Sequence, residues 1–429
     1  MNKFWKTLIT CILLVVACLC FTACENGGSE NGANGYVFKT YGDDGYYTLV
    51  SYKGEDKTLN VPAEYEGKKV GRIKANAFSG NKTIENLVIP TTVEVIDQSA
   101  FGGMSALKEL TVPFVGQYAL AEAKLGDNNV SGELKAVDMA RTFGFMFSTT
   151  SYDGGMSLTQ TYNDATETDS EGNTTATGVF TFYMPALLKT VNIVPAEDNY
   201  VVPAYAFYGN VALHKITLSD KVMVIGEKAF ANCLTLNTLT IPNSVKTIES
   251  HAIYGCRALS NEVNGVGFKF ADESTLTTIG DFAFAGSKLV SIEIPASVTK
   301  IGKYAFSSIT SGNEVTESGA TQLKQVAIKG ATVEIDEGAF YMCEKLERVE
   351  FSNASASVKL GAYAFAYCKN LNVFDSASPN VINLAKVSEI STMAFANIKD
   401  LSFNVMVGSF TSSALESLNV FFKTEVTFN

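Results

Sequence analysis

The amino-acid sequence predicts an α/β repeat solenoid, a right-handed stack of short strands joined by turns or short helices, with about 23 residues per repeat. Two observations predict this fold. An Ala-Phe dipeptide, or a close variant, recurs along the chain, and a short apolar-polar alternation precedes it. The intervals from Ala77 to Ala100, from Ala206 to Ala229 and from Ala229 to Ala252 are each 23 residues. Such a unit cannot bury its own apolar side chains, so neighbouring units must stack.

The first part of each repeat is predicted to be a short strand. Residues 236–256 read LNTLTIPNSVKTIESHAIYGC, and residues 289–306 read LVSIEIPASVTKIGKYAF in the same frame. In the first segment Leu239 and Ile241 alternate with threonines, which indicates a strand with one face inward. Pro242 then ends the strand, where its missing N–H group costs least.

A second extended piece and a turn complete the repeat. Val245 and Ile248 point inward from the extended piece, and the Ala-Phe dipeptide follows on a tight or helical turn where the Phe ring fills the core. The dipeptide or its variant lies at Ala77-Phe78, Ala100-Phe101, Ala119-Leu120, Ala206-Phe207, Ala229-Phe230, Ala252-Ile253, Ala283-Phe284, Ala305-Phe306, Ala339-Phe340, Ala364-Phe365 and Ala394-Phe395.

This frame, close to L-x-x-I-x-I-P-x-S-V-x-x-I-G-x-x-A-F-x-x-C, resembles the BspA-like branch of the leucine-rich-repeat superfamily, which comprises surface and secreted proteins of bacteria. The resemblance covers most of residues 36–401 and includes the opening Val61-Pro62. It implies adhesion or protein binding at the cell surface and implies no chemistry. The family glycine is present at Gly226, Gly280 and Gly302 but is replaced by Asp97, Glu249 and Asp336, so we expect a turn that prefers glycine without requiring it.

The N-terminus has the pattern of an export signal. Lys3 and Lys6 precede an uncharged apolar run of about a dozen residues, which is shorter than the ~20 residues that span a bilayer. The following Phe21-Thr22-Ala23-Cys24 resembles a lipobox, so residues 1–23 are predicted to be a lipoprotein signal peptide and Cys24 the lipid attachment site. Cys18 and secretion without a lipid are the alternatives; cleavage before Cys18 would leave an apolar mature end.

Composition suggests the remaining boundaries. Residues 24–35 are a flexible polar tether, residues 36–401 the solenoid and residues 402–429 a C-terminal cap. An elaborated insertion interrupts the repeat at about 121–187, and its core, 148–178, is expected to be an exposed hairpin or loop. Aromatic residues frame that core: Phe143, Phe145, Phe147, Tyr162, Phe180, Phe182 and Tyr183.

Four cysteines lie beyond the export segment, and each follows the Phe or Ile of the dipeptide by three residues: Cys233, Cys256, Cys343 and Cys368. Export would favour disulfides. Other repeats place Asn, Ser, Met or Ile at this position, however, which indicates packing. Stacked side chains would also point the same way and not toward each other. We therefore favour buried free thiols over Cys233–Cys256 and Cys343–Cys368 disulfides.

The sequence carries no motif for catalysis, metal or cofactor binding. The two histidines, His214 and His251, occupy different repeat positions and no nucleophile elbow, and CxxC, HExxH and Walker-type motifs are absent from the sequence. The acidic cluster Asp164, Glu167, Asp169 and Glu171 is interpreted as solvated charge in a polar loop. A net charge of -11 without a basic run argues against nucleic acid as a partner.

The outward row of the first strands is the predicted binding surface, because an extended face suits a large partner. By alternation it comprises Glu109, Thr111, Lys215, Thr217, Thr238, Thr240, Ser291, Glu293, Arg348 and Glu350. The sequence therefore predicts a monomeric, lipid-anchored surface protein that binds a host or neighbouring-cell protein or glycan. An envelope spacer and a glycan-active enzyme are the alternatives; a surface patch of aromatic residues would favour adhesion over the spacer.

Overall fold

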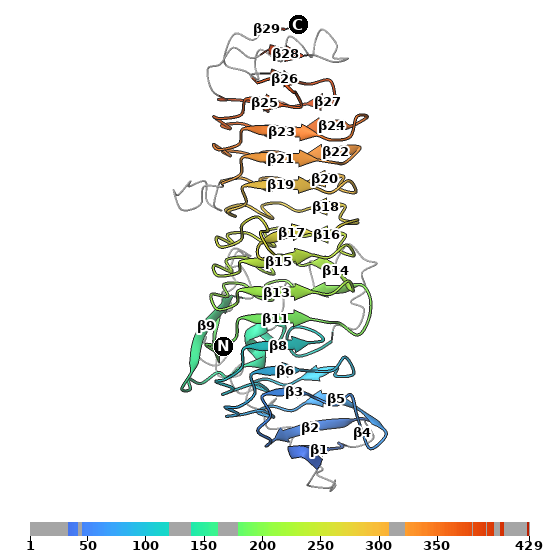
Figure 1. Cartoon of the computed structure of the whole chain (residues 1–429), viewed down its shortest axis with the longest axis vertical. Helices are drawn as coiled ribbons and strands as arrows, with labels where there is room; N and C mark the ends of the chain where they lie inside the picture. The colour runs from blue at the N-terminus through green and yellow to red at the C-terminus, as the bar shows by residue number, and fades with distance from the viewer. Residues whose placement is uncertain are drawn as a thin grey trace, which may run out of the picture.

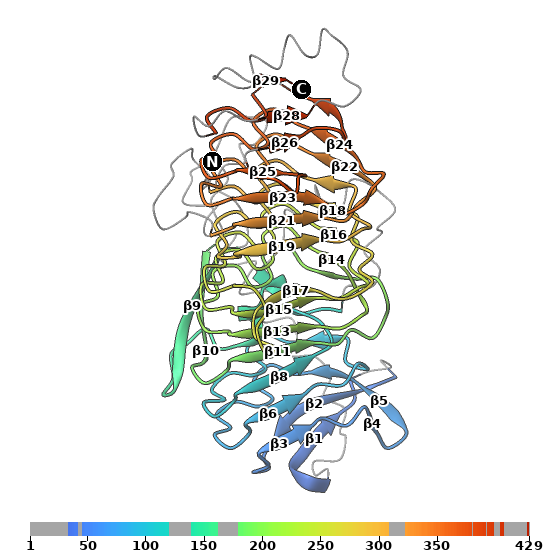
Figure 2. The ribbon, with the colours of Figure 1, turned by 45° about the horizontal axis from the view of Figure 1, so that its top comes forward.

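The chain is described by a computed structural model over residues 33–41, 45–119, 139–161, 179–308, 322–379, 381–391, 393–398, 404–406 and 427–428. It forms a parallel β-solenoid of about 12 turns, drawn in Figures 1 and 2, with the N-terminal strands at one end of the stack and the C-terminal strands at the other. The predicted repeat solenoid is confirmed. Cys24 and residues 1–23, nearly all of the predicted tether and most of the predicted cap lie outside the described residues.

The predicted first strands form one column of the stack, divided into two parallel sheets. Aligned neighbours keep the same face inward: Val191 pairs with Leu110 on one side and Ile216 on the other. The first sheet contains β3 (Thr58–Asn60), β6 (Asn86–Val88), β8 (Glu109–Val112), β11 (Thr190–Ile193), β13 (Lys215–Leu218), β15 (Thr238–Ile241) and β17 (Phe268–Phe270). The second contains β19 (Ser291–Ile294), β21 (Gln325–Ile328), β23 (Arg348–Phe351), β25 (Val373–Phe374), β26 (Val381–Asn383), β28 (Asn404–Met406) and β29 (Thr427–Phe428).

From residue 200 onward the second extended pieces of the repeats form the other column. Its eight strands are β12 (Tyr200–Val202), β14 (Val222–Ile225), β16 (Thr247–Ile248), β18 (Thr278–Ile279), β20 (Lys300–Ile301), β22 (Thr332–Ile335), β24 (Ser357–Leu360) and β27 (Val387–Ile390). Val245 and Ile248 are fully buried, as predicted. The first turn follows η1 (Ala33–Gly35) and is closed by a mixed sheet of β1 (Tyr36–Lys39), β2 (Tyr47–Tyr52), β4 (Glu64–Tyr65), β5 (Lys68–Ile73) and β7 (Val95–Ile96).

The Ala-Phe dipeptides make the third side of the solenoid, as turns and not helices in the described residues. In most of these turns the Phe N–H group donates to the Ala carbonyl of the next repeat, as in Phe306 to Ala339 and Phe340 to Ala364, both at 2.8 Å. The Phe rings are buried and stacked: Phe340 lies 5.2 Å from Phe306 and 5.0 Å from Phe365, with rings parallel within 4°. The turn side therefore has its own backbone ladder and an aromatic core column.

A left-handed residue precedes the alanine in most of these turns. His251, Phe282 and Tyr304, for example, have φ of 55°, 55° and 54°. The glycine position three residues before this alanine has a different cause. A Cβ on Gly226 would lie 2.5 Å from the Val202 carbonyl oxygen of the preceding turn, so glycine is favoured there by close approach between turns and not by a positive φ.

The four cysteines are free and buried, which confirms the favoured prediction. Each thiol donates to a Phe carbonyl of the preceding repeat: Cys233 Sγ lies 3.1 Å from the Phe207 oxygen and Cys343 Sγ 3.2 Å from the Phe306 oxygen. Burial raises the pKa of the Cys256 thiol to about 12, although a backbone hydrogen bond at Cys233 acts in the opposite direction. The cysteine position is therefore a hydrogen-bond donor site between repeats.

The insertion replaces one Ala-Phe turn. Two short 3-10 helices, η3 (Met139–Arg141) and η4 (Phe143–Met146), occupy the turn side. The Phe101 N–H group donates to the Met146 carbonyl, and the Phe143 N–H group donates to Ala206. The prediction that Ala119-Leu120 forms this turn was therefore wrong, because the ladder passes through η4; Leu120 itself lies outside the described residues.

A hairpin follows η4 and stands at the side of the stack in Figures 1 and 2. It consists of β9 (Gly155–Thr161) paired antiparallel with β10 (Val179–Pro185). From β9 the fully buried Gln160 accepts a hydrogen bond from the Gly144 N–H group at 2.6 Å and donates to the Ala206 carbonyl at 3.2 Å. This amide joins η4, the hairpin and the next regular turn. The acidic cluster at 164–171 lies outside the described residues.

Candidate binding surfaces

The predicted strand face lies on the first column and is polar. On β8, β13, β19 and β23 the outward residues are exposed or half-buried and the intervening residues are buried, as alternation predicts. Thr240 is half-buried on β15. Thr238 is an exception: it is only 9% exposed, and its hydroxyl donates to the Asn237 side chain at 2.9 Å. Thr238 is therefore not available as a surface residue.

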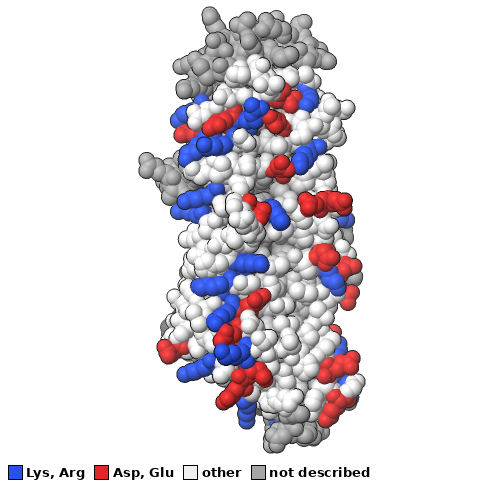
Figure 3. Space-filling view, viewed as in Figure 1, with Lys and Arg blue, Asp and Glu red and all other residues white. Residues whose placement is uncertain are grey.

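Most charged residues of the strand face form ion pairs or hydrogen bonds with neighbours. Arg348 lies 2.6 Å from Glu350, and Glu293 lies 2.6 Å from Lys329. In Figure 3 positive and negative side chains are interleaved over this face, with uncharged areas between them. The strand face therefore lacks a field of one sign that would steer a charged partner over a distance.

Asn192 on β11 was not among the predicted residues. Its amide donates to the Glu109 carboxylate at 2.7 Å and to the Thr111 hydroxyl at 3.1 Å. The chain reaches β11 only after the insertion, so β8 and β11 are far apart in the sequence and adjacent in the sheet. Their pairing could have been suspected from the alternation of Val191 and Ile193.

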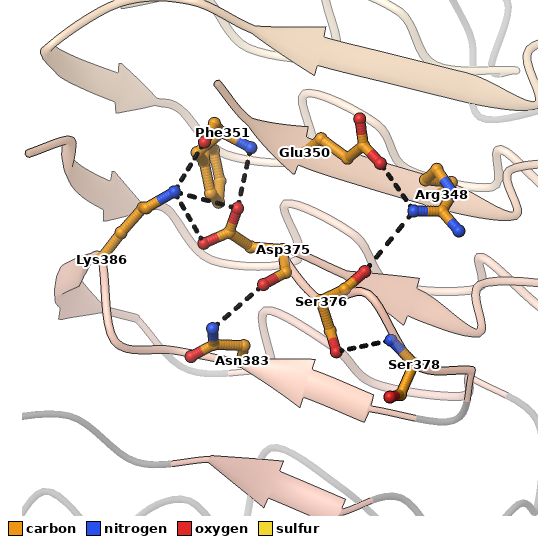
Figure 4. A network of polar contacts seen from close by, with 8 residues as sticks. All are labelled: Arg348, Glu350, Phe351, Asp375, Ser376, Ser378, Asn383 and Lys386. Atoms are coloured by element: carbon orange, nitrogen blue, oxygen red, sulfur yellow. Dashed lines mark hydrogen bonds and ion pairs between the residues drawn. The ribbon is translucent and has the colours of Figure 1, made fainter. Parts of the chain in front are cut away.

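A second polar network lies at the C-terminal part of the same face, shown in Figure 4. Lys386 donates to the Phe351 carbonyl at 2.6 Å and to the Asp375 carboxylate at 3.2 Å, and that carboxylate accepts the Phe351 N–H group at 3.1 Å. Asp375 has a left-handed φ of 48° directly after the two-residue β25. The side chains of Asp375 and Lys386 are 9% and 22% exposed. Beyond the end of β25, these side chains bond the Phe351 N–H and carbonyl groups of β23 in place of a backbone partner. We therefore assign the network a structural role and not a binding role.

A row of half-buried aromatic side chains runs along the turn side, and we call it the turn-side aromatic row. It comprises Tyr205, Tyr208, His251, Tyr254, Phe282, Tyr304, Tyr341, Tyr363 and Tyr367. The ring centroids of His251 and Phe282 are 4.7 Å apart, and those of Phe282 and Tyr304 are 5.1 Å apart. The row continues from Tyr304 to Tyr341 at 6.1 Å and from Tyr341 to Tyr367 at 5.2 Å.

The bulky residues of this row that precede alanine adopt a backbone conformation that disfavours them. A left-handed φ for a ring-bearing residue is uncommon and costs of order 1 kcal/mol or more. Its repetition at Tyr205, His251, Phe282, Tyr304 and Tyr363 places a ring on the same line of the surface in turn after turn. Lys228 fills the line between Tyr205 and His251, and its Nζ lies 5.2 Å from the Tyr205 ring centroid.

His251 is neutral within this row near physiological pH. Burial, and to a smaller extent the charge of Lys228, lowers the pKa of His251 from 6.5 to about 4. Its Nδ1 lies 2.7 Å from the Ser250 hydroxyl. His214 lies before β13 in the strand column, so the structure does not bring the two histidines together.

The sequence contained one signal for this row: the residue before alanine is Tyr, Lys, His or Phe in several repeats. The adjacency of the rings could not be read from it, because loops of different length separate them in the sequence. Across the described ranges no three His, Cys, Asp or Glu side chains are grouped closely enough to hold a metal ion. Within those ranges, too, no helix is sufficiently long and apolar to cross a bilayer.

Solved structures of bacterial leucine-rich-repeat proteins resemble the chain at low identity. A leucine-rich repeat protein from Bacteroides ovatus is 17% identical over 94% of this chain and 99% of its own, with a TM-score of 0.37. A leucine rich cell surface protein from Faecalibacterium prausnitzii is 20% identical over 95% and 96%, with a TM-score of 0.33. The pneumococcal vaccine antigen PcpA is 14% identical over 94% and 99%, with a TM-score of 0.31. Among curated proteins none matches the sequence significantly.

The sequence pattern of the BspA type leucine rich repeat region matches the chain in six copies. The matches cover residues 68–151, 200–266, 268–320 and 318–420, which is more than half of the chain. They include most strands of both columns, the Ala-Phe turns and the cysteine positions described above. The chain therefore belongs to the BspA-type leucine-rich-repeat family.

Proposed function

We propose that this protein is a lipid-anchored, extracytoplasmic adhesion protein that binds a protein or glycan of a host or neighbouring cell through its turn-side aromatic row. The turn-side aromatic row is the main support for this proposal, because it is an extended line of partly exposed rings. Packing of the core does not require aromatic residues at these surface positions. An envelope spacer that contacts only its own cell would be served by a uniformly polar surface.

The row suits a macromolecular partner for two physical reasons. Tyrosine provides large contact area with few rotatable bonds, and it is enriched at binding hot spots. Here the rings are also held by one another, since the planes of His251, Phe282 and Tyr304 are parallel within 16° and 21°. Little side-chain entropy is then lost when a partner binds. From His251 to Tyr304 the ring faces stack on one another, so this part of the row offers ring edges, whereas the Tyr341 ring is turned by 77° from the Tyr304 ring.

The strand face is the second candidate surface for the same partner. Its exposed members Lys215, Thr217 and Glu293 are polar, and its ion pairs are formed within the face. We expect its contribution to affinity to be smaller, since exposed ion pairs are each worth less than about 1 kcal/mol.

Binding and anchoring need separate tests. The full chain would be applied to arrays of extracellular-matrix proteins and glycans, together with a variant carrying Tyr304→Ser, Tyr341→Ser and Tyr367→Ser. A matched control would carry Thr217→Ala and Glu293→Gln on the strand face. Saturable binding that is lost in the row variant and kept in the control supports the proposal. Binding lost only in the control variant would move the site to the strand face, and no binding by any form would favour the spacer.

Lipid attachment at Cys24 is tested in cells. Metabolic labelling with a radioactive fatty acid is expected to label the chain, and Cys24→Ser is expected to abolish both labelling and membrane association. Cys18→Ser is the control and should leave labelling unchanged. Export of an unlabelled wild-type chain would instead support secretion without a lipid.

A further inference from the structure

A polar and aromatic cluster lies on the N-terminal sheet, apart from both surfaces described above. It begins with a β-bulge: Tyr47 pairs with Val70 and Thr48 pairs with Arg72, so Gly71 has no partner on β2. A bulge redirects the next side chain, and such features recur beside binding sites. Here the side chain of Arg72 is 29% exposed between the fully buried Val70 and Ile73.

Arg72 and Asp97 form the centre of the cluster. The guanidinium donates from Nε to Asp97 Oδ2 at 3.1 Å and from Nη2 to Oδ1 at 2.8 Å, which is a bidentate arrangement. Burial alone would lower the pKa of Arg72, but the Asp97 carboxylate more than offsets this, so the pKa is raised. Asp97 stands where Gly226, Gly280 and Gly302 stand in other repeats.

Two tyrosines flank this pair. Tyr46 packs over the bulge, since a Cβ on Gly71 would lie 2.7 Å from its ring. On the other side, Tyr118 pairs with Val95, which in turn pairs with Arg72. In their ionised form both tyrosines also raise the pKa of Arg72 through their charge. Tyr118 is 54% exposed, so its side chain is open to solvent.

We propose that this cluster, Tyr46, Arg72, Asp97 and Tyr118, is a binding site for a neutral saccharide. Adjacent hydroxyl groups of a sugar both donate and accept hydrogen bonds, and the guanidinium hydrogens and carboxylate lone pairs that the bidentate pair leaves unused supply matching donors and acceptors side by side. The exposed Tyr118 ring offers an apolar surface to the C–H face of a sugar ring. The charge of Arg72 is balanced by Asp97, and the charge of the neighbouring Lys69 is balanced by Glu94 at 2.7 Å. The site therefore has no net charge, and this favours an uncharged ligand.

The chain itself supplies a control for a purely structural role. Lys300 and Asp336 occupy the same two repeat positions as Arg72 and Asp97 and form an ion pair at 3.2 Å. Each cation precedes the inward Ile of its strand, and each aspartate follows the inward Ile of the next repeat. The bulge at Arg72 lies between β5 and the preceding strand β2, whereas the corresponding pairing of β20 with the preceding strand β18 keeps a regular register, so the second pair has the ion pair without the redirecting bulge.

The test uses the full chain in mild detergent and immobilised hexasaccharides of glucose, mannose, galactose and N-acetylglucosamine, with oligogalacturonate as the acidic probe. Binding to at least one neutral probe is expected. Tyr118→Ala and Asp97→Asn should each weaken it at least about tenfold, as for a central interface contact. Asp336→Asn should leave it unchanged, and Tyr118→Ala should retain the wild-type melting temperature.

Three outcomes would overturn the proposal: no binding to any neutral probe, binding to oligogalacturonate alone, or equal binding by wild type, Tyr118→Ala and Asp97→Asn. The third outcome would place saccharide binding elsewhere on the chain. The row variant Tyr304→Ser/Tyr341→Ser/Tyr367→Ser should bind these probes like wild type, so failure at this site and failure of the turn-side aromatic row remain distinguishable.

Discussion

The side chain of Asn261 joins the two sheets of the first strand column by bonding to Ser291. Its Nδ2 donates to the Ser291 carbonyl at 2.5 Å and to its hydroxyl at 3.2 Å, and its Oδ1 accepts the N–H groups of Ser291 at 3.0 Å and Val290 at 2.7 Å. β17 and β19 belong to separate sheets. One amide side chain therefore takes the place of a rung of the backbone ladder.

Replacing this amide should weaken the junction. Asn261→Ala leaves polar groups of Val290 and Ser291 without their partner, so we expect the free energy of unfolding to fall by about 2 kcal/mol. Hydrogen exchange at the Val290 and Ser291 amides should accelerate more than exchange in β13. Ser260→Ala is the neighbouring control, because Ser260 is exposed. Unchanged exchange at the junction would contradict the role assigned to Asn261.

The Phe column should dominate the stability of the turn side. Phe340→Ala removes a fully buried ring between two stacked neighbours and should lower the free energy of unfolding by about 4 kcal/mol. Phe180→Ala on the hairpin is the control, since that ring is 38% exposed and its loss should cost less than about 1 kcal/mol. Urea unfolding followed by circular dichroism gives both values, and similar losses would refute the difference.

The four buried thiols should be unreactive in the folded protein. Cys233, Cys256, Cys343 and Cys368 are at most 1% exposed, and only the thiolate reacts quickly with an alkylating agent. Iodoacetamide at pH 8.5, followed by peptide mass spectrometry, should leave them unmodified until guanidinium is added. Dithiothreitol should not change the melting temperature. A disulfide-linked peptide containing Cys233 and Cys256 would show that the thiols are not free.

His251 should make stability depend on pH. Its pKa is about 4 in the folded chain, against 6.5 for a histidine side chain exposed to water, so between these values the unfolded chain binds more protons. The contribution to stability is complete above pH 6.5 and is lost as the pH falls toward 4. His251→Phe, which has a precedent in Phe282 at the same repeat position, should flatten the melting temperature over this range. An unchanged slope would show that other groups cause it.

The fold could be predicted because the same pattern of apolar and polar residues recurs from repeat to repeat. Inward residues recur at a fixed phase, so the alternation around Leu239 and Ile241 gave the strand and the face that it buries. The same reasoning assigned the cysteines to packing, and the structure added the reason, a hydrogen bond to a Phe carbonyl. It misassigned Ala119-Leu120, because two short 3-10 helices continue the ladder with an unrelated sequence.

The surfaces were harder to predict because they depend on which repeats become neighbours. Alternation placed Lys215 and Glu293 outward correctly, yet it could not show that Thr238 is covered. The contact of His251 with Phe282 crosses a lengthened repeat, and the pairing of Arg72 with Asp97 beside Tyr118 requires a bulge and an irregular strand. The alternation of inward and outward residues predicts neither contacts across a lengthened repeat nor contacts created by a bulge.

The hydrogen bonds of Gln160 also bear on how such a protein can lengthen. The amide spans η4 and the Ala206 turn, so the stack continues in register although the chain leaves it to form a hairpin. A long insertion is then tolerated wherever one buried side chain can form the hydrogen bonds that the backbone of a regular turn would otherwise form. A solenoid of this kind can therefore lengthen along its axis by added repeats. It can also accept an insertion at a turn, where a single buried side chain connects the insertion to the neighbouring repeats.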